Sequence, residues 1–360
     1  MPGPDGRPTG GYKMVYEYAN RFAADGFDVT VIYPEFCGPP RKNTRLFRFL
    51  KFVKHRFLFM KNKLFKIERR MPSWFALDFR VKREYVWRFR DTVRRSESGV
   101  KYVATALPTS FELVAAVQNP GQNYYFVQGF ESWWTQSTDD RLVYDSYRLP
   151  LKKITIAPWL VKKIESAGEN AALVENGLDF DYFKMTVPIE SRSPYEVAML
   201  YHPAPHKGVQ DAFDALKIVK EKVPALHVTM FGTFAPPALP DWFTFYLCPD
   251  QETHNRIYNN AAVFVAPSRL EGMGLTPAEA MMCGCAVACT DNPGFEIFSR
   301  DNDTTLVSKA RDVNALAANI LRLIEDTTLR LRIAAAGHAY IRQFTWERAY
   351  AKFKAAVELE

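Results

Sequence analysis

The spacing of apolar residues along the chain switches several times between a helical period and the alternation of a β-strand. Near the amino terminus a helical period runs through Val15, Tyr18, Ala19, Phe22 and Ala23. Gly26 ends that pattern, and residues 28–33 then alternate as a β-strand. Apolar runs predict the further strands of the first half at 100–105, 123–127, 153–157 and 171–174. This half therefore has the pattern of an α/β domain.

The second half of the chain alternates strand and helix more regularly. Strands are predicted at 195–200, 227–231, 243–247, 261–266 and 286–289. Helices are predicted at 209–219, 312–324, 328–341 and from residue 344 onward. Alternation at this pitch predicts a parallel, doubly wound sheet.

Length and composition agree with two domains. A chain of 360 residues with 48% hydrophobic residues can form two cores of ordinary size. The polar, proline-containing stretch 186–194 is predicted as a linker. We therefore expect an amino-terminal domain at 1–185, a carboxyl-terminal domain at 195–343 and a final helix within 344–360.

Much of the net charge of +7 comes from a basic, aromatic insert at 41–90. Within 41–70, lysines and arginines alternate with phenylalanines and leucines, and Glu68 is the single acid. Three interpretations stay open: an anionic membrane surface, an ordinary amphipathic surface of the domain, and a nucleic-acid site. We favour the membrane and expect no nucleic-acid partner, because no nucleic-acid module is recognisable elsewhere.

The sequence predicts a cytoplasmic protein. No segment approaches the ~18 uninterrupted apolar residues of a membrane span, and no basic-then-apolar signal peptide opens the chain. The five cysteines do not suggest a disulfide framework. Cys283, Cys285 and Cys289 lie in an apolar helix–strand passage, so we interpret them as small core residues in preference to zinc ligands.

The most informative segment is 267–284, where Glu271 and Glu279 flank a glycine-rich bend that opens a helix. Gly272 and Gly274 allow the backbone to approach a ligand closely. The amino-terminal end of a helix favours a diphosphate, and carboxylates accept hydrogen bonds from sugar or ribose hydroxyls. The pattern therefore suits a nucleotide sugar.

A purely structural interpretation competes at Glu279. Thr276 is expected to cap the helix, with Pro277 at its first position. Because Thr276 and Glu279 have the spacing of a capping box, Glu279 is either a ligand-binding group or a helix cap.

Segment 267–284 resembles the E-x7-E signature of retaining glycosyltransferase family 4, whose members have the GT-B fold. Further matches cover most of the chain: residues 10–31 resemble the family's first helix and second strand, Lys207-Gly208 its Lys-Gly, and 176–183 its Asn-Gly-Val-Asp…Phe element. Segments 104–109 and 125–131 are similar to bacterial rhamnosyltransferase-like enzymes of surface-polysaccharide assembly.

This resemblance implies two Rossmann-like, doubly wound parallel-sheet domains that face a cleft, with the final helix crossing back to the first domain. The family's first domain begins with a strand directly before its glycine loop. Residues 1–9 contain Pro2, Pro4 and Pro8 and no apolar run. We therefore expect the first sheet to lack its first strand, either because the coding start lies upstream or because the chain is a truncated version.

The resemblance also assigns roles around the cleft. Glu271 lies at the donor sugar as the leading catalytic residue, Lys207 places its ammonium on the pyrophosphate, and Glu279 binds the ribose. On the local pattern alone, a solvated surface lysine is the favoured interpretation of Lys207, and the resemblance reverses that preference. The remaining donor-binding residues are expected to be Gly272, Gly274, Leu275, Thr276, His202 and Gly294.

His202 stands where the family has an arginine, so His202 or His206 is expected to replace it as a weaker phosphate donor. For the loop at Gly294, a simple Pro-Gly turn is the alternative.

On the acceptor side, Gly10, Gly11, Lys13 and Glu131 are the candidates. Glu131 precedes Trp133 and Trp134, which are either sugar-stacking rings or core residues. No Asp-x-Asp metal motif follows a strand, so we expect neither a metal site nor a cofactor, with the nucleotide sugar as a substrate.

The sequence thus predicts a retaining, hexosyltransferase-type enzyme that moves a sugar from a nucleotide sugar to a glycan or lipid-linked acceptor. The expected process is cell-surface polysaccharide synthesis, with the protein peripheral on the inner face of the plasma membrane. A catalytically weakened sugar-nucleotide or membrane-surface binding protein of the same fold is the alternative. A nicotinamide dehydrogenase is disfavoured because no G-x-G-x-x-G follows a first strand.

Overall fold

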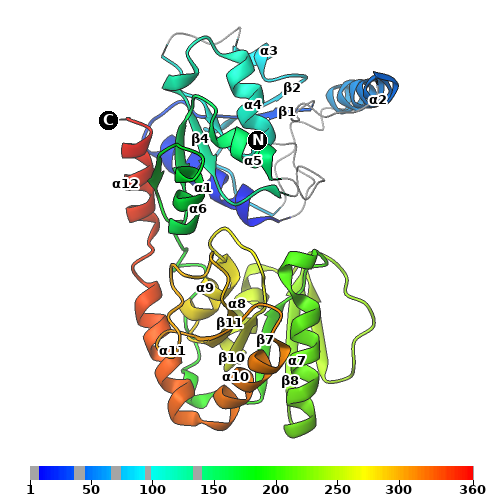
Figure 1. Cartoon of the computed structure of the whole chain (residues 1–360), viewed down its shortest axis with the longest axis vertical. Helices are drawn as coiled ribbons and strands as arrows, with labels where there is room; N and C mark the ends of the chain where they lie inside the picture. The colour runs from blue at the N-terminus through cyan, green and yellow to red at the C-terminus, as the bar shows by residue number, and fades with distance from the viewer. Residues whose placement is uncertain (1–7, 36–44, 66–73, 94–98, 133–139, 360) are drawn as a thin grey trace. The chain divides into compact units, whose positions relative to one another are not determined.

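A computed structural model describes residues 8–35, 45–65, 74–93, 99–132 and 140–359. The chain divides into two compact units (Figure 1). Unit 1 consists of residues 1–174 and 350–360, and unit 2 of residues 175–349.

Unit 1 contains two parallel sheets. The smaller pairs β1 (Thr30–Pro34) with β2 (Lys82–Val86). The larger has the order β3-β4-β5-β6, formed by Val103–Ala104, Tyr124–Val127, Lys152–Thr155 and Ala171–Leu173. The helices are α1 (Gly10–Ala24), α2 (Arg45–Leu64), α3 (Arg90–Val93), α4 (Leu107–Ala116), α5 (Arg141–Tyr147) and α6 (Pro158–Glu165). Thus β2, a sheet strand, comes from the stretch that the sequence assigned to the basic insert.

Helix α1 forms as its pattern predicts and is buried on two sides: Tyr18 and Phe22 contact the ring of Phe353, and the hydroxyl of Tyr16 lies 2.7 Å from that of Tyr33. The final helix α12 (Trp346–Ala356) packs on α1, because the ring of Phe353 stacks on that of Tyr18 with 4.2 Å between the ring centroids. Residues 350–360 accordingly belong to unit 1. The expected return of the last helix to the first domain is confirmed.

Unit 2 is built on one six-stranded sheet of order β12-β11-β10-β7-β8-β9, in which all neighbours are parallel. The strands are Glu196–Leu200 (β7), His227–Gly232 (β8), Phe243–Leu247 (β9), Val263–Ala266 (β10), Ala286–Thr290 (β11) and Leu306–Ser308 (β12). The helices are Val209–Lys222 (α7), Gln251–Asn260 (α8), Leu275–Met282 (α9), Val313–Glu325 (α10) and Thr327–Ile341 (α11).

Successive residues of each strand in unit 2 pack against helices on opposite faces of the sheet. In β10, Val263 and Val265 join a core formed with α7, α10 and α11. Phe264 between them packs its ring 5.6 Å from that of Tyr258 on α8. Because successive strand residues point to opposite faces, the sheet is covered on both sides. The predicted doubly wound α/β architecture is confirmed.

Among the described residues, no helix combines the length and the apolar composition needed to cross a bilayer.

Candidate functional site

The candidate site of unit 2 lies where the order of its strands reverses. The chain passes from β7 to β8 and β9 on one side, and returns to the other side of β7 to form β10, β11 and β12. In open α/β sheets, ligands bind beyond the carboxyl ends of the strands at such a switch point. The loops after β7, β10 and β11 meet there and carry Lys207, Glu271 and Gly294.

Lys207 and Glu271 form the central contact of the site. The Lys207 ammonium nitrogen lies 2.7 Å from one Glu271 carboxylate oxygen and 2.9 Å from the other. The side chains are only 20% and 16% exposed, so water screens their attraction less than at an open surface. Two residues that are 64 positions apart thus share one charged centre.

Gly208 allows the turn that holds Lys207 to lie against the β10 loop. Its backbone adopts φ of +63°, and an added Cβ would overlap the carbonyl oxygen of Pro267. Residues with a side chain rarely adopt this conformation, so glycine is required here for both reasons. The Lys-Gly pair predicted from the sequence is therefore a positioning element as well as a source of charge.

Asn292 ties the Glu271 loop to the loop after β11, and sequence reasoning missed it. Its side-chain oxygen accepts hydrogen bonds from the backbone N–H of Glu271 (3.1 Å) and of Gly294 (2.9 Å). Its amide nitrogen donates to the carbonyl oxygen of Ser268 at 3.1 Å. Asn292 is 1% exposed. The Asn-Pro-Gly sequence marks a turn, but nothing in it indicates which loop Asn292 holds.

Gly294 brings these two loops close together. A Cβ at this position would lie 2.5 Å from the carbonyl oxygen of Glu271, which is too close for any other residue. Gly294 thus lies against the backbone of Glu271, and its donor-binding role stays a prediction.

Arg269 is a second residue that the sequence did not indicate. Its guanidinium binds both carboxylate oxygens of Asp211, at 2.7 and 3.0 Å, and its backbone N–H donates to the carbonyl oxygen of His206 at 2.7 Å. Asp211 lies in the first turn of α7. Because bidentate Arg–carboxylate pairs fix geometry, Arg269 holds the β10 loop against the segment that carries Lys207.

The predicted start of α9 was wrong. Gly274 is the N-cap, and no side chain caps the helix, so Thr276 lies inside the first turn and forms no capping box with Glu279. The glycine bend makes Leu275 the first helical residue, two residues earlier than the sequence suggested. Thr276 lines a small recess together with Lys207.

Glu279 is buried on α9 and makes a contact that the capping-box alternative does not include. The hydroxyl of Tyr258 donates to its carboxylate at 3.2 Å, and the residue is 8% exposed. The helix-cap role is thus excluded, and the ligand-binding role of Glu279 stays a prediction.

Both candidate histidines are partly buried beside Lys207. Burial, and then the Lys207 charge, lower the pKa of His202 to about 4 and also lower the pKa of His206. The His202 Nδ1 accepts the backbone N–H of Ala204 at 3.1 Å, which leaves Nε2 as its donor. At neutral pH both imidazoles are uncharged, so either donates to a phosphate more weakly than an arginine does.

The acceptor-side candidates lie in unit 1. Gly10 and Gly11 open α1, and Lys13 follows in its first turn. The Glu131 carboxylate accepts a hydrogen bond from the backbone N–H of Leu107 at the start of α4. It is 7% exposed, and burial raises its pKa to about 8. Trp133 and Trp134 lie outside the described residues.

The three cysteines near α9 are core residues. Cys283, Cys285 and Cys289 are all buried, and the thiol of Cys285 donates to the carbonyl oxygen of Tyr258 at 3.0 Å. In the part of the chain that the structure describes, no three His, Cys, Asp or Glu side chains are grouped to hold a metal ion.

Comparison with known proteins connects this site to glycosyl transfer. Residues 197–326 match the family model described as glycosyl transferases group 1. The chain is 39% identical over 92 residues to the O-antigen chain mannosyltransferase B of Escherichia coli. This match covers 25% of this chain and 23% of that protein. It is 25% identical over 199 residues to the phosphatidyl-myo-inositol mannosyltransferase of Mycobacterium tuberculosis. This match covers 51% of this chain and 53% of that protein. The chain thus spans about half, or less, of the length of these relatives.

The fold has close structural counterparts. Anabaena HepE, solved in complex with UDP-glucose, superposes with a TM-score of 0.73 at 15% identity, over 99% of this chain and 98% of that one. Sucrose-phosphate synthase from Thermosynechococcus elongatus gives 0.69 at 14% identity, over 97% and 93%. The architecture is GT-B, and the match to the group 1 glycosyl transferase model falls within unit 2.

Proposed function

We propose that this chain, whose unit 2 matches the group 1 glycosyl transferase model, is a retaining enzyme of the family 4 type. Its donor is a nucleotide sugar and its acceptor a glycan or lipid-linked saccharide of cell-surface polysaccharide synthesis. The Lys207–Glu271 pair at the sheet's switch point carries this proposal. The names of the relatives support it, since they transfer mannose to O-antigen and to phosphatidyl-myo-inositol.

In the proposed reaction, the donor diphosphate lies against Lys207 and the open first turn of α9. Both supply positive potential where charge develops as the nucleoside diphosphate leaves. The acceptor hydroxyl attacks the anomeric carbon from the face that the diphosphate leaves, and the departing phosphate oxygen takes its proton. Glu271 lies beside the donor sugar, and Glu279 binds the ribose. The protein positions the reactants and stabilises charge.

Lys207 has a second task in this scheme. Before the donor binds, its ammonium is neutralised by Glu271. A diphosphate competes for that ammonium, which leaves the Glu271 carboxylate available to sugar hydroxyls. Donor binding therefore separates Lys207 from Glu271. Meanwhile Arg269 and Asn292 hold the loops that carry these two residues in place.

The first test is transfer by Glu271→Gln after a screen of nucleotide sugars by thermal shift has identified the donor. We expect at least about tenfold slower transfer, a loss of ~1.4 kcal/mol or more in transition-state stabilisation. The fold should stay intact because Glu271 lies in a loop, while loss of the carboxylate partner of Lys207 should lower the melting temperature. We propose that no divalent metal is needed, so the wild type should keep its activity in chelator.

Glu221→Gln is the matched control, because Glu221 is an exposed glutamate near the end of α7, away from the loops of the site. Glu271→Gln with the activity of this control would remove Glu271 from its role. A wild type that binds a nucleotide sugar but neither transfers nor hydrolyses it would be a binding protein of the same fold.

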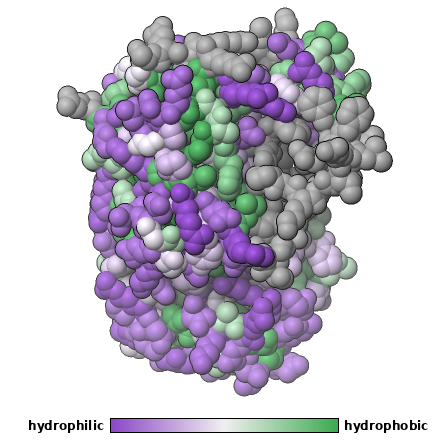
Figure 2. Space-filling model, turned by 45° about the horizontal axis from the view of Figure 1, so that its top comes forward, coloured by the Kyte–Doolittle hydropathy of each residue, from purple (hydrophilic) through white to green (hydrophobic). Residues whose placement is uncertain are grey.

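We also propose that α2 attaches the enzyme to the cytoplasmic leaflet, where a lipid-linked acceptor is presented. Val53, Phe57, Met60 and Leu64 are 48%, 70%, 55% and 77% exposed. Their spacing of four, three and four places them on one helical face. Lys54, Arg56, Lys61 and Lys63 supply charge beside this stripe. On the face shown in Figure 2, hydrophobic side chains gather in patches within a mostly hydrophilic surface. An exposed apolar stripe with basic neighbours fits an anionic interface.

A further inference from the structure

A buried hydrogen bond joins helices α8 and α9 of unit 2. The hydroxyl of Tyr258 lies 3.2 Å from a carboxylate oxygen of Glu279, 21 positions away in the chain. Tyr258 is 0% exposed and Glu279 is 8% exposed. The bond thus connects the carboxylate that we propose to bind the ribose with a tyrosine that lies outside the loops of the site.

Four aromatic rings hold the Tyr258 side chain in place. The imidazole of His254, one helical turn earlier on α8, stacks on its ring with 5.0 Å between the centroids. Phe231 in β8 and Phe264 in β10 pack at centroid distances of 5.5 and 5.6 Å. Phe183 adds an edge-to-face contact at 5.5 Å. Because close-packed core side chains sit in defined rotamers, the Tyr258 hydroxyl keeps one direction, towards α9.

The same bond restricts the carboxylate of Glu279. A glutamate side chain has several rotamers, and ordering it opposes binding of any ligand that needs a single one of them. The bond from Tyr258 holds one carboxylate oxygen before a ligand arrives. Since a carboxylate has about four acceptor positions, this bond leaves acceptor capacity for ligand hydroxyls. Tyr258 thus preorganises Glu279 without using up its binding chemistry.

Segment 176–183 supports both members of the pair. Its Phe183 packs on the Tyr258 ring. Burial, and then the negative charge of Glu279, raise the pKa of the neighbouring Tyr182 to about 12. The Tyr182 backbone N–H donates to the Asp179 carboxylate at 3.0 Å, which fixes the turn that carries both aromatic residues. The contacts of Tyr258 and Glu279 therefore come from α8, α9 and this turn together.

We propose that Tyr258 is a positioning residue, whose hydroxyl aims the Glu279 carboxylate at the pentose hydroxyls of the donor nucleotide. This inference rests on the proposed function, in which Glu279 binds the ribose. Tyr258 is fully buried and acts through Glu279, not by contact with the ligand. Loss of its hydroxyl should therefore weaken recognition of the pentose and leave the contact between the diphosphate and Lys207 unchanged.

The test measures nucleotide affinity of the full chain by titration calorimetry. The probes are UDP, GDP, ADP, CDP and dTDP, each compared with its 2′,3′-dideoxy form, which lacks the pentose hydroxyls. The wild type should bind its preferred nucleotide at least about tenfold more tightly than the dideoxy form. Tyr258→Phe removes a single oxygen and should lower this ratio at least about threefold, because only the affinity for the hydroxylated nucleotide falls.

Tyr340→Phe is the matched control. Tyr340 lies on α11, where its hydroxyl accepts a hydrogen bond from Arg300 at 3.2 Å, and its loss should leave the ratio unchanged. A Tyr258→Phe variant with a lower melting temperature but the wild-type ratio would overturn the proposal, since the hydrogen bond would then be purely structural.

Glu279→Gln separates this inference from the proposed function. If Glu279→Gln lowers the ratio and Tyr258→Phe does not, only the positioning role of Tyr258 fails. If Glu279→Gln keeps the wild-type ratio, Glu279 does not bind the pentose, and the donor assignment fails with the inference. A wild type that binds none of the five nucleotides would likewise overturn both.

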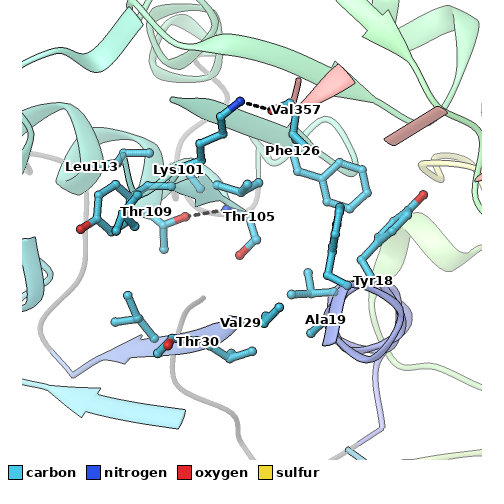
Figure 3. A pocket seen from close by; sticks show the side chains of 18 of the residues that line it. Tyr18, Ala19, Val29, Thr30, Lys101, Thr105, Thr109, Leu113, Phe126 and Val357 are labelled. Carbon is cyan, nitrogen blue, oxygen red and sulfur yellow. Dashed lines mark hydrogen bonds between the residues drawn. The ribbon is translucent and has the colours of Figure 1, made fainter. Parts of the chain in front are cut away.

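The pocket of unit 1 is the alternative place for a nucleoside. Its volume of about 400 Å³ is that of a small-molecule site, and Thr30 and Thr105 lie on opposite walls, at β1 and after β3 (Figure 3). The Thr105 hydroxyl is buried and has no hydrogen-bond partner among the described residues. Thr105→Val should leave the ratio unchanged. A ratio that falls with Thr105→Val and not with Tyr258→Phe would assign the nucleotide to unit 1 and overturn the proposal.

Discussion

Asn292 shows how one buried side chain anchors the loop that carries Glu271. It accepts from the N–H groups of Glu271 and Gly294. Asn292→Ala leaves both donors buried without a partner, and each such loss costs about 1–3 kcal/mol. We expect lower thermal stability of unit 2 together with at least tenfold weaker transfer, because the Glu271 backbone loses its anchor. Melting curves and steady-state kinetics measure the two effects.

Asn319→Ala is the control for Asn292→Ala. Asn319 is also a buried asparagine of unit 2, but it lies on α10 and bonds to Arg322. It should lower stability without a specific effect on transfer. If both variants lose activity only in proportion to their stability, Asn292 has a general structural role.

The raised pKa of Glu131 predicts that the stability of the protein depends on pH. Burial raises its pKa from 4.5 to about 8, so the folded state keeps a proton that the unfolded state releases above pH 4.5. The stability from this group is complete below about pH 4.5. It falls by about 1.4 kcal/mol per pH unit as the pH rises towards 8, and levels off above that value.

Glu131→Gln removes this titration. The free energy of unfolding of the variant minus that of the wild type should therefore increase between pH 5 and 8. Denaturant unfolding at each pH measures it, and Glu165→Gln, at an exposed position of α6, should show no such trend. Curves for wild type and Glu131→Gln that stay parallel would mean that Glu131 is ionised in the folded protein.

At the scale of elements, α2 packs on unit 1 with one side and exposes apolar and basic side chains on the other. The ring of Phe59 lies 5.8 Å from that of Trp87 in an edge-to-face contact, and His55 lies 3.2 Å from the Glu35 carboxylate. The helix therefore has one attached side and one exposed apolar stripe. This arrangement agrees with an amphipathic surface helix.

Reversing the charge of α2 tests its proposed membrane role. The variant with Arg48, Lys51, Lys54 and Arg56 each replaced by Glu should lose binding to anionic vesicles. Each suitably placed basic residue contributes about 1 kcal/mol, and the wild-type binding should weaken with added salt. Donor hydrolysis in solution should be unchanged. Vesicle sedimentation measures the binding.

The matched control reverses four exposed basic residues of unit 2: Lys217, Lys222, Lys309 and Arg342. It carries the same change in net charge and should keep vesicle binding. A wild type that does not bind anionic vesicles at low ionic strength would contradict the membrane role of α2.

At the scale of the whole molecule, each unit has its own sheet system and core. The proposed donor residues Lys207, Glu271 and Glu279 all belong to unit 2. A nucleoside diphosphate at about 100 times its dissociation constant should therefore slow hydrogen exchange in the loops 201–208, 267–276 and 290–296, by up to about 100-fold where exchange requires the free state. Exchange in β1 and β2 is the internal reference. Protection confined to unit 1 would show that the donor assignment is wrong.

The sequence alone predicted five of the six strands of unit 2, all except β12, and it identified Lys207 and Glu271 as candidate site residues. This was possible because strand–helix alternation predicts a parallel sheet, and the carboxyl ends of neighbouring parallel strands bring their loops together. Lys207 and Glu271 could thus be predicted to lie near each other from their places after two strands. The start of α9 was misjudged, because Gly274 ended the loop two residues before the expected cap at Thr276.

Only the tertiary structure decided which residues hold the loops of that site in place and where unit 1 contains a pocket. Asn292 meets Glu271 across 21 positions, and Arg269 meets Asp211 across 58. The burial that raises the pKa of Glu131 and the pocket between β1 and β3 also depend on which elements become neighbours in space. Local periodicity records how each segment folds, whereas such contacts arise from the order of strands in the sheets, which no single segment encodes.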